Sequence, residues 1–434
     1  MPLLSQPLPP ARDSRAVPAP AGCAAECAAD LPPRRRAPVT VALADSRWQG
    51  HHPTYLRQFA ASLQRLGCRV LVLCRRPDEF QDCDPGTLRT ELLDDIPRSV
   101  LFRGKENDPL VNLDRWRRLR RSLNRAEARS GWTADLIFFP YLDTYLRHQI
   151  VPGLPALLLG RPWSGLYFYN RHFRRGDARG FLRRGLDHLD RGDLNLRSAN
   201  CKLIGSLDER YLQEISRYAG GVPTIQFPDI TSTATRPHET PLSAEIRKRA
   251  AGRPVVGIIG LERRKGFLTL LRAALELGEG AGIFFCLAGK LCRETLHDDE
   301  LAFALSFRAP HVHFDPEADS IDNDFHYNAL FQTFTAVYGA YEGFDGSSNA
   351  LTKAAAFRKV LIGTRNTCFG DRVERFGMGF TIDEGNLPQA TDAIRAATAP
   401  DPLPAPRFDA YFAEHSTGAL DRAFAATLRA ASLA

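Results

Sequence analysis

The chain has 434 residues, a net charge of +7 at neutral pH and 44% hydrophobic residues. This length exceeds what one hydrophobic core usually serves, so we expect two domains. The positive charge is modest for the length and does not call for a nucleic-acid partner, so we expect none. The basic residues are 50 arginines and only 7 lysines, which makes each lysine informative.

The nine cysteines are scattered, without a Cys-x-x-Cys pair or a Cys/His cluster at zinc spacing. Such a set favours reduced thiols in a cytoplasmic protein and offers no zinc site. No apolar run reaches the roughly 18–20 residues that span a bilayer. Residues 1–37 are rich in Pro, Ala and Arg and lack the continuous apolar core of a signal peptide, so we expect a disordered tail.

The first half of the chain alternates apolar runs with helical patterns. Unbroken apolar runs at residues 39–44 and 69–74 flank an amphipathic pattern at residues 55–66, which predicts a parallel βαβ unit. Residues 134–141, 165–170 and 201–206 predict three more strands. We therefore predict a doubly wound α/β domain over residues 38–228.

A Pro-, Thr- and Ser-rich segment without periodicity, residues 227–243, predicts the interdomain linker. Strand and helix patterns alternate again beyond it, which predicts a second Rossmann-like domain over residues 229–434. Its closing helical segment, residues 407–434, is long enough to pack back across both domains. Ligand is expected in the cleft, at the carboxyl ends of the strands.

A basic turn lies between a predicted strand and a predicted helix in the stretch GLERRKGF. It places Arg263, Arg264 and Lys265 beside a helix N-terminus, whose free N–H groups also attract anions. This combination predicts a diphosphate site. The alternative is a solvated basic turn.

A second turn, in the stretch YEGFDGSSNALTKAAAF, carries Glu342 before it and a predicted helix after it. Ser347, Ser348 and Asn349 are all good N-cap residues for that helix. Lys353 lies in the first two helical turns, where a cation opposes the helix dipole by a few tenths of a kcal/mol. A bound anion would reverse that sign, whereas the alternatives are a lysine that extends to solvent or pairs with Glu342.

These two stretches, in this order, resemble the donor-binding domain of GT-B glycosyltransferases, in particular the retaining family 4 class. The family carries a Gly-containing turn with Arg and Lys, matched here by GLERRKGF, and then a motif with two glutamates, matched by EGFDGSSNALTKAAAFRKVLI. The resemblance covers most of residues 255–380, and the first domain in pattern only. It implies an α/β protein of the GT-B fold, with two Rossmann-like doubly wound domains and a nucleotide sugar bound in the interdomain cleft.

The resemblance also implies roles for individual residues. Arg264 and Lys265 would hold the donor diphosphate with Arg263 as a third cation, and Glu342 would match the first motif glutamate near the donor sugar. The other donor-side candidates are Gly343, Phe344, Ser347, Ser348 and Asn349. Lys353 stands where the family has a glutamate that grips the ribose. A lysine cannot accept a hydrogen bond from a ribose hydroxyl, but it can hold a phosphate.

The stretch DSRWQGHHPTYL matches the glycine-containing first loop of these enzymes. Gly50 permits close approach of the backbone to a ligand, and His51 or His52 is the candidate for contact with substrate or for proton transfer. A capping role is the alternative, because Pro53 fits the first helical position and puts His52 at the N-cap. Further acceptor-side candidates after predicted strands are Asp143, Arg171 and His172.

An arginine-rich helical pattern covers residues 114–129, with Trp116, Leu119, Leu123 and Ala126 on one face. The pattern is typical of two kinds of helix. One is a membrane-surface helix, which would give the protein a weak peripheral contact with the inner face of the membrane. The other is an ordinary helix that packs its apolar face on the sheet. The second interpretation is favoured, because arginine is the general surface cation of this chain.

The acidic stretches HDDE (297–300) and DNDF (322–325) lack a strand context, so we expect neither a metal site nor a cofactor beyond the nucleotide sugar as co-substrate. The expected function is a metal-independent, retaining glycosyltransferase acting on an unidentified glycan, lipid-linked or small-molecule acceptor. Two alternatives stay open: a catalytically degenerate GT-B-like scaffold, and an epimerase or hydrolase of nucleotide sugars.

Overall fold

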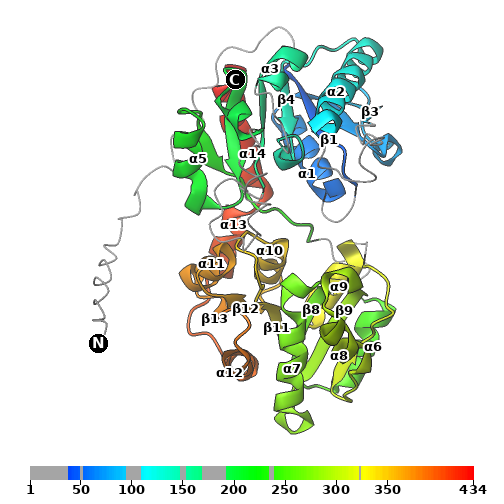
Figure 1. Cartoon of the computed structure of the whole chain (residues 1–434), viewed down its shortest axis with the longest axis vertical. Coiled ribbons are helices and arrows are strands. Elements are labelled where there is room, and N and C mark those ends of the chain that lie inside the picture. Colours follow the sequence, from blue (N-terminus) through cyan, green and yellow to red (C-terminus); the bar gives the residue numbers. More distant parts are fainter. Residues whose placement is uncertain are drawn as a thin grey trace, which may run out of the picture.

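The computed structural model describes residues 38–48, 52–93, 109–146, 153–168, 192–233, 239–321 and 324–434. They form two lobes, each built on a parallel sheet (Figure 1). The disordered tail predicted for residues 1–37 lies outside the described residues.

The first sheet has the strand order β3-β2-β1-β4-β5-β6-β7. Its strands are β1 (Thr40–Asp45), β2 (Arg69–Cys74), β3 (Leu88–Leu92), β4 (Leu136–Phe139), β5 (Trp163–Leu166), β6 (Cys201–Ser206) and β7 (Thr224–Gln226). The helices between them are α1 (His52–Arg65), α2 (Pro109–Ser130), α3 (Leu154–Leu159) and α5 (Leu212–Tyr218). The apolar runs of the sequence predict β1, β2, β4, β5 and β6 but not the edge strands β3 and β7, which are less buried or very short.

The second sheet has the order β10-β9-β8-β11-β12-β13. Its strands are β8 (Val255–Leu261), β9 (Phe284–Leu291), β10 (Val312–Phe314), β11 (Ala336–Gly339), β12 (Val360–Thr364) and β13 (Gly379–Ile382). Its helices are α6 (Pro241–Ala250), α7 (Phe267–Leu277), α8 (Asp298–Ser306), α9 (Asp324–Thr333), α10 (Asn349–Ala356), α11 (Cys368–Phe376) and α12 (Leu387–Thr398). Both sheets are therefore doubly wound, as predicted.

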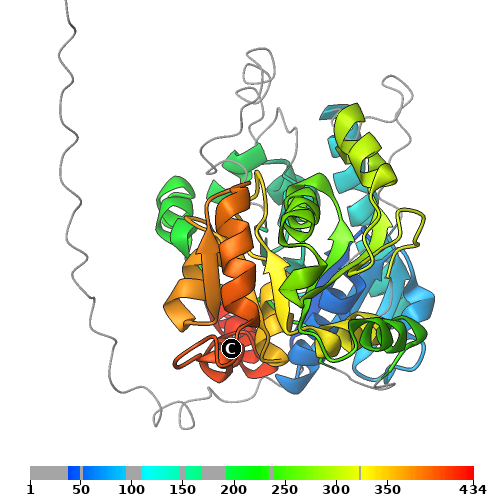
Figure 2. The same ribbon diagram turned by 90° about the horizontal axis from the view of Figure 1, so that it is seen from below.

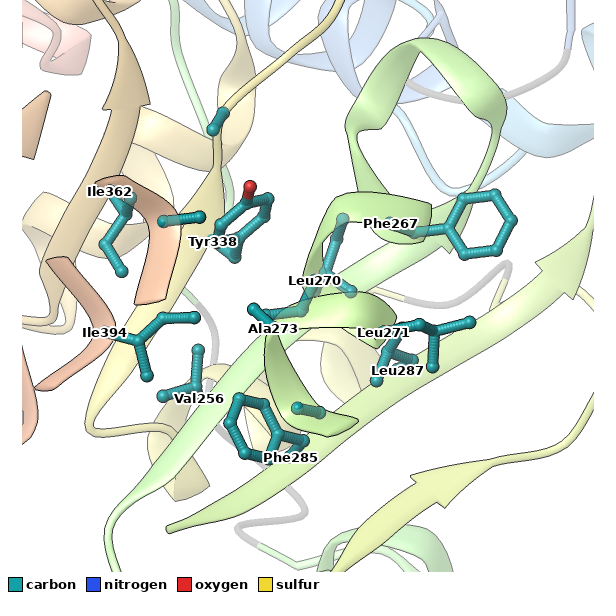
Figure 3. Close-up of a cluster of buried hydrophobic side chains, with 14 of the residues drawn as sticks. Val256, Phe267, Leu270, Leu271, Ala273, Phe285, Leu287, Tyr338, Ile362 and Ile394 are labelled. Carbon is teal, nitrogen blue, oxygen red and sulfur yellow. The ribbon is translucent and has the colours of Figure 1, made fainter. Parts of the chain in front are cut away.

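Helices cover both faces of the second sheet, which Figure 2 shows from below. On one face α7 places Phe267, Leu270 and Leu271, at helical spacing, over Val256 and Phe285 of the strands (Figure 3). Residues that alternate along β8 face opposite sides, so the strand reads as one continuous apolar run.

The last two helices, α13 (Phe408–Glu414) and α14 (Thr417–Ala430), return the chain to the first domain. The Phe424 ring of α14 packs 4.9 Å from the Phe138 ring, 5.2 Å from Phe59 and 5.5 Å from Phe227. Residues 417–430, which lie in the range predicted for the second domain, thus belong to the core of the first.

The apolar face of α2 is buried. Trp116, Leu119 and Leu123 are fully enclosed against the first sheet, and Arg125 and Arg129 pair with the buried Glu91. The structure therefore supports the interpretation as a packing helix, because its apolar face is not available to a membrane. Within the described part of the chain, no helix combines the length and apolarity that crossing a bilayer requires.

Candidate functional site

The two sequence motifs meet at the carboxyl ends of neighbouring strands. The turn Arg263–Lys265 follows β8 and the turn that begins at Glu342 follows β11, and β8 pairs with β11. The Glu342 N–H donates a 2.8 Å hydrogen bond to the Arg264 carbonyl. This is the point of the sheet where the strand order reverses and where open α/β sheets bind ligands.

Gly266 allows this approach of backbone to backbone. Its φ is +74°, and a Cβ atom at this position would lie 2.3 Å from the Ala340 carbonyl oxygen. Any side chain would therefore push the two turns apart.

All three predicted phosphate-binding cations have carboxylate partners, and Lys265 has the most distant one, Glu262 at 4.0 Å. Arg263 pairs with Glu300 of α8 at 2.9 Å, which directs it away from the second turn. Arg264 pairs with Glu262 at 2.7 Å and lies over the Phe344 ring, 5.2 Å from its centroid. Arg264 is thus the cation that the structure brings to the Glu342 turn.

Lys265 turns inward. Its ammonium donates to the Ile259 carbonyl at 3.0 Å, and burial lowers its pKa. Gly260, with φ +82°, leaves room for it, because a Cβ there would lie 2.4 Å from Lys265 Nζ. Lys265 also lines a small cavity with Tyr327 and Tyr338, and the Tyr338 hydroxyl is buried there without a hydrogen-bond partner among the described residues.

The second turn presents both side-chain and backbone groups. Glu342 accepts a 2.7 Å hydrogen bond from the Thr269 hydroxyl of α7, which fixes the carboxylate beside the basic turn. Gly343 has φ +62° and donates its N–H to Glu384 at 2.9 Å. Ser348 caps α10 by accepting from the Ala350 N–H.

Ser347 and Asn349 face the linker. The buried Ser347 hydroxyl donates to Asp229 at 2.6 Å. The Asn349 amide donates to the Ile230 carbonyl and accepts from the Thr231 hydroxyl at 3.0 Å. In this arrangement both side chains fasten the turn to residues 229–231.

Lys353 is buried and has three protein partners. Its ammonium donates to Asn328 Oδ1 at 2.6 Å and to the Ser232 carbonyl at 3.1 Å, and it lies 3.5 Å from Asp324. Burial lowers its pKa, an effect that Asp324 opposes. Lys353 is 3% exposed, so it neither extends to solvent nor pairs with Glu342.

In the first domain, His52 is the first residue of α1, the helix that follows β1. Its Nδ1 lies 2.7 Å from Asp45 Oδ2, and its ring packs 4.7 Å from that of Tyr141. Asp45, an acid at the end of a buried strand, is a partner of His52 that sequence reasoning missed. Two residues along α1, the Thr54 hydroxyl donates to Asp324 of the second domain at 3.2 Å.

Four predicted residues lie outside the described part of the chain: Gly50, His51, Arg171 and His172. Asp143 is fully buried and accepts a 2.6 Å hydrogen bond from the Phe168 N–H, an arrangement typical of a structural carboxylate.

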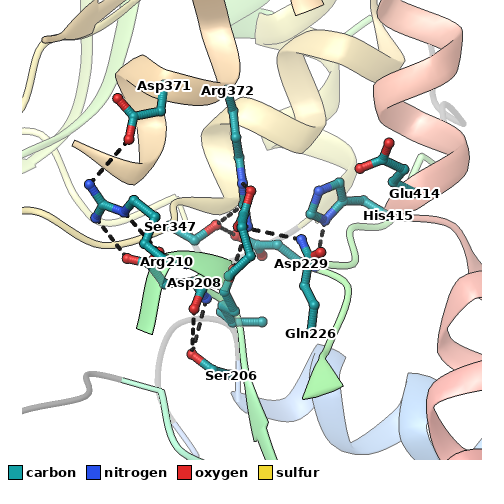
Figure 4. A network of polar contacts seen from close by, with 12 residues as sticks. Ser206, Asp208, Arg210, Gln226, Asp229, Ser347, Asp371, Arg372, Glu414 and His415 are labelled. Carbon is teal, nitrogen blue, oxygen red and sulfur yellow. Dashed lines mark hydrogen bonds and ion pairs between the residues drawn. The ribbon is translucent and has the colours of Figure 1, made fainter. Parts of the chain in front are cut away.

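A buried polar network, also missed from sequence, joins the domains at the linker (Figure 4). Arg372 of α11 donates to Ser347 at 2.8 Å and pairs with Glu209 at 2.6 Å. Asp229 accepts from the Ser347 hydroxyl, and its N–H donates to His415 Nδ1 at 2.8 Å. The predicted donor turn is therefore held by residues from both domains.

The residues described contain one group of three His, Cys, Asp or Glu side chains close enough to share a metal ion: Asp208, Glu209 and Cys368. Asp208 pairs with Arg210, and Glu209 pairs with Arg372. Guanidinium groups thus already occupy both carboxylates, which does not fit a metal centre.

Most of the chain is similar in structure to several solved proteins. Sucrose-phosphate synthase from Thermosynechococcus elongatus is 18% identical with a TM-score of 0.58, over 91% of this chain and 98% of that one. HepE from Anabaena, solved with UDP and glucose, is 14% identical with a TM-score of 0.60, over 90% and 99%. WaaG, a glycosyltransferase involved in lipopolysaccharide biosynthesis, is 15% identical with a TM-score of 0.57, over 91% and 99%.

No family model matches the chain, and no curated protein matches it. The structural likeness confirms the GT-B architecture expected from the sequence, with its two Rossmann-like domains.

Proposed function

We propose that this GT-B protein is a glycosyltransferase that moves a sugar from a nucleotide-diphosphate sugar to an acceptor. The observation that carries the proposal is the backbone junction between the two turns, where the Glu342 N–H donates to the Arg264 carbonyl. It fixes the Glu342 carboxylate and the Arg264 guanidinium close together at the edge of the second sheet where open α/β sheets bind ligands. A solved neighbour of the same fold, WaaG, is named as a glycosyltransferase.

The chemistry follows from the charges. As the bond to the donor sugar breaks, negative charge grows on the departing diphosphate, and Arg264 and Lys265 would stabilise it without a metal ion. Glu342, oriented by Thr269, would accept hydrogen bonds from the sugar hydroxyls. By the family resemblance, the anomeric configuration is retained.

The acceptor would enter from the first domain. There the Asp45 carboxylate holds the Nδ1 edge of His52, an arrangement that favours the tautomer with its proton on Nδ1 and makes Nε2 the basic nitrogen. His52 is therefore our candidate for proton transfer to or from the acceptor, a glycan, a lipid-linked sugar or a small molecule. The described cysteines are free thiols, which supports action in the cytoplasm.

The test is donor binding. Thermal-shift and calorimetric titrations with UDP, ADP, GDP and their sugar conjugates should identify one stabilising donor. Arg264→Ala and Lys265→Met should each weaken it by about tenfold or more, since each removes a charged hydrogen bond to phosphate. Lys290→Met, at an exposed lysine, is the matched control. Unchanged donor affinity in both variants would contradict the diphosphate site.

A second candidate function rests on Lys353. Its ammonium is committed to Asn328, Ser232 and Asp324, so the helix offers no acceptor for a ribose at this position. A GT-B-like scaffold without catalysis would show this feature, and it predicts no stabilisation by any nucleotide. A nucleotide-sugar epimerase or hydrolase, in contrast, would turn over its donor without an acceptor.

A further inference from the structure

The turn Gly343–Ser348 is contacted from the first domain by two consecutive residues, Arg210 and Tyr211. Arg210 follows β6 in the short 3₁₀ turn Glu209–Tyr211, and its side chain crosses to the second domain. Two of its hydrogen bonds are made within the first domain. Its Nε and Nη2 donate to the two carboxylate oxygens of Asp208 at 2.9 and 2.8 Å. This bidentate pair fixes the plane of the guanidinium.

The remaining side-chain hydrogen bonds of Arg210 are with the second domain. Nη2 donates to the Asp345 carbonyl at 2.7 Å and also contacts the Asp345 carboxylate. Nη1 contacts Asp371 of α11 at 3.3 Å (Figure 4). The neighbouring Tyr211 hydroxyl donates to the other carboxylate oxygen of Asp345 at 2.7 Å.

Asp345 thus receives hydrogen bonds from two consecutive first-domain side chains, on both carboxylate oxygens and on its carbonyl. It lies between Gly343 and Ser347 in the turn, and Ser347 is in turn bound to Asp229 of the linker. The position of this turn is consequently set by the end of β6 as well as by its own sheet.

We propose that Arg210 and Asp345 form an interdomain clamp that positions the Gly343–Ser348 turn for transfer across the cleft. The inference rests on the proposed function, because it takes this turn as the donor site. Arg210 and Asp345 are positioning residues in this scheme: they act on the donor through the backbone of the turn. A lysine in place of Arg210 cannot bind Asp208 with two parallel hydrogen bonds and reach Asp345 at the same time.

Hydrogen exchange of the full chain tests the clamp without any activity. Amides of residues 343–348 should exchange about tenfold faster in Arg210→Ala, in Arg210→Lys and in Asp345→Asn, because each variant loses a charged hydrogen bond. The double variant Arg210→Ala/Asp345→Ala is compared with the single variants Arg210→Ala and Asp345→Ala. Its amides should exchange no faster than those of the faster single variant, as expected when both substitutions remove the same interaction. The matched control is Arg365→Ala, which removes an ion pair with Asp383 inside the second domain.

Donor titration separates this inference from the proposed function. If the wild type binds a nucleotide sugar, the clamp variants should weaken binding by about tenfold while the control does not. If the wild type binds none, the proposed function fails, and hydrogen exchange still decides the clamp. Unchanged exchange in the turn for Arg210→Lys and Asp345→Asn, with both variants folded, overturns it.

Discussion

Lys353 Nζ lies 2.6 Å from Asn328 Oδ1, so the one lysine of helix α10 binds the neighbouring helix α9. The same ammonium also reaches the linker carbonyl of Ser232 and the Asp324 carboxylate. Asp324 in turn accepts from Thr54 of α1. Lys353 therefore connects α9, α10, the linker and, through Asp324, the first domain.

Lys353→Met should destabilise the protein by about 2–4 kcal/mol, since it keeps the apolar stem and leaves buried acceptors without a donor. Lys353→Glu should cost more, because it buries a carboxylate beside Asp324 and does not restore a ribose contact. Urea denaturation gives both free energies of unfolding, with Lys290→Met at an exposed site as the control. A stable Lys353→Glu protein with tighter donor binding would contradict this account.

Gly266→Ala should separate the two turns of the candidate site. The substitution combines a left-handed backbone, which costs about 1–2 kcal/mol, with a Cβ atom 2.3 Å from the Ala340 carbonyl, and overpacking adds about 1–3 kcal/mol. Gly282→Ala is the control, since φ is +68° there and the added Cβ meets no atom within 4 Å. Equal losses of stability in the two variants would show that the turns do not need this close approach.

Asp45→Asn should lower turnover by roughly 10²–10⁴-fold if His52 transfers a proton, because the amide no longer favours the imidazole tautomer with Nδ1 protonated. Donor affinity should stay the same, since Asp45 lies in the first domain. The measurement is kcat against the donor dissociation constant, and His326→Ala, at an exposed histidine of α9, controls for loss of a histidine. A change confined to donor affinity would remove His52 from the proton-transfer role.

Asp421 gives stability a defined pH dependence. Burial raises its pKa, but hydrogen bonds from Arg65 and Ser62 of α1 outweigh burial and hold the pKa below its ordinary value. A carboxyl group with a lowered folded pKa stabilises the protein above its unfolded pKa, about 3.9, and this contribution is lost as the pH falls through the folded value.

Asp421→Asn should therefore cost about 1–2 kcal/mol at pH 7, and the difference from wild type should shrink below about pH 4. The control is Asp409→Asn, whose partner Arg358 is exposed. The Asp409→Asn substitution should change the free energy of unfolding by no more than about 0.5 kcal/mol. The measurement is the free energy of unfolding of wild type and Asp421→Asn from pH 3 to pH 7. A difference between the two proteins that stays constant over that range would contradict the role given to Asp421.

Local sequence patterns predict the central strands of the sheets well, because a buried parallel strand must be apolar on both faces. The runs at residues 39–44 and 69–74 needed no tertiary information. The partners of Lys353 could not be found in this way: Asn328 lies 25 residues upstream and Ser232 lies 121 residues upstream. The dipole argument correctly marked Lys353 as unusual, but only the fold shows that its compensating acceptors come from α9 and the linker.

The interdomain residues were missed for the same reason. Arg372 is one of 50 arginines, and nothing in its neighbourhood distinguishes it from a surface cation. Its burial depends on Glu209, 163 residues away. In an arginine-rich chain, the position of an arginine in sequence carries little information about whether it is buried.

The return of α14 to the first domain has a consequence for biosynthesis. Phe424 completes the aromatic cluster of Phe59, Phe138 and Phe227, yet it is translated almost 200 residues after Phe227. The first domain leaves the ribosome before α14 has been synthesised. The surface of its core that Phe424 covers therefore stays exposed while the second domain is synthesised. Its core closes last, from the C-terminus, so a ribosome stalled anywhere before residue 417 leaves a nascent chain that a chaperone should recognise.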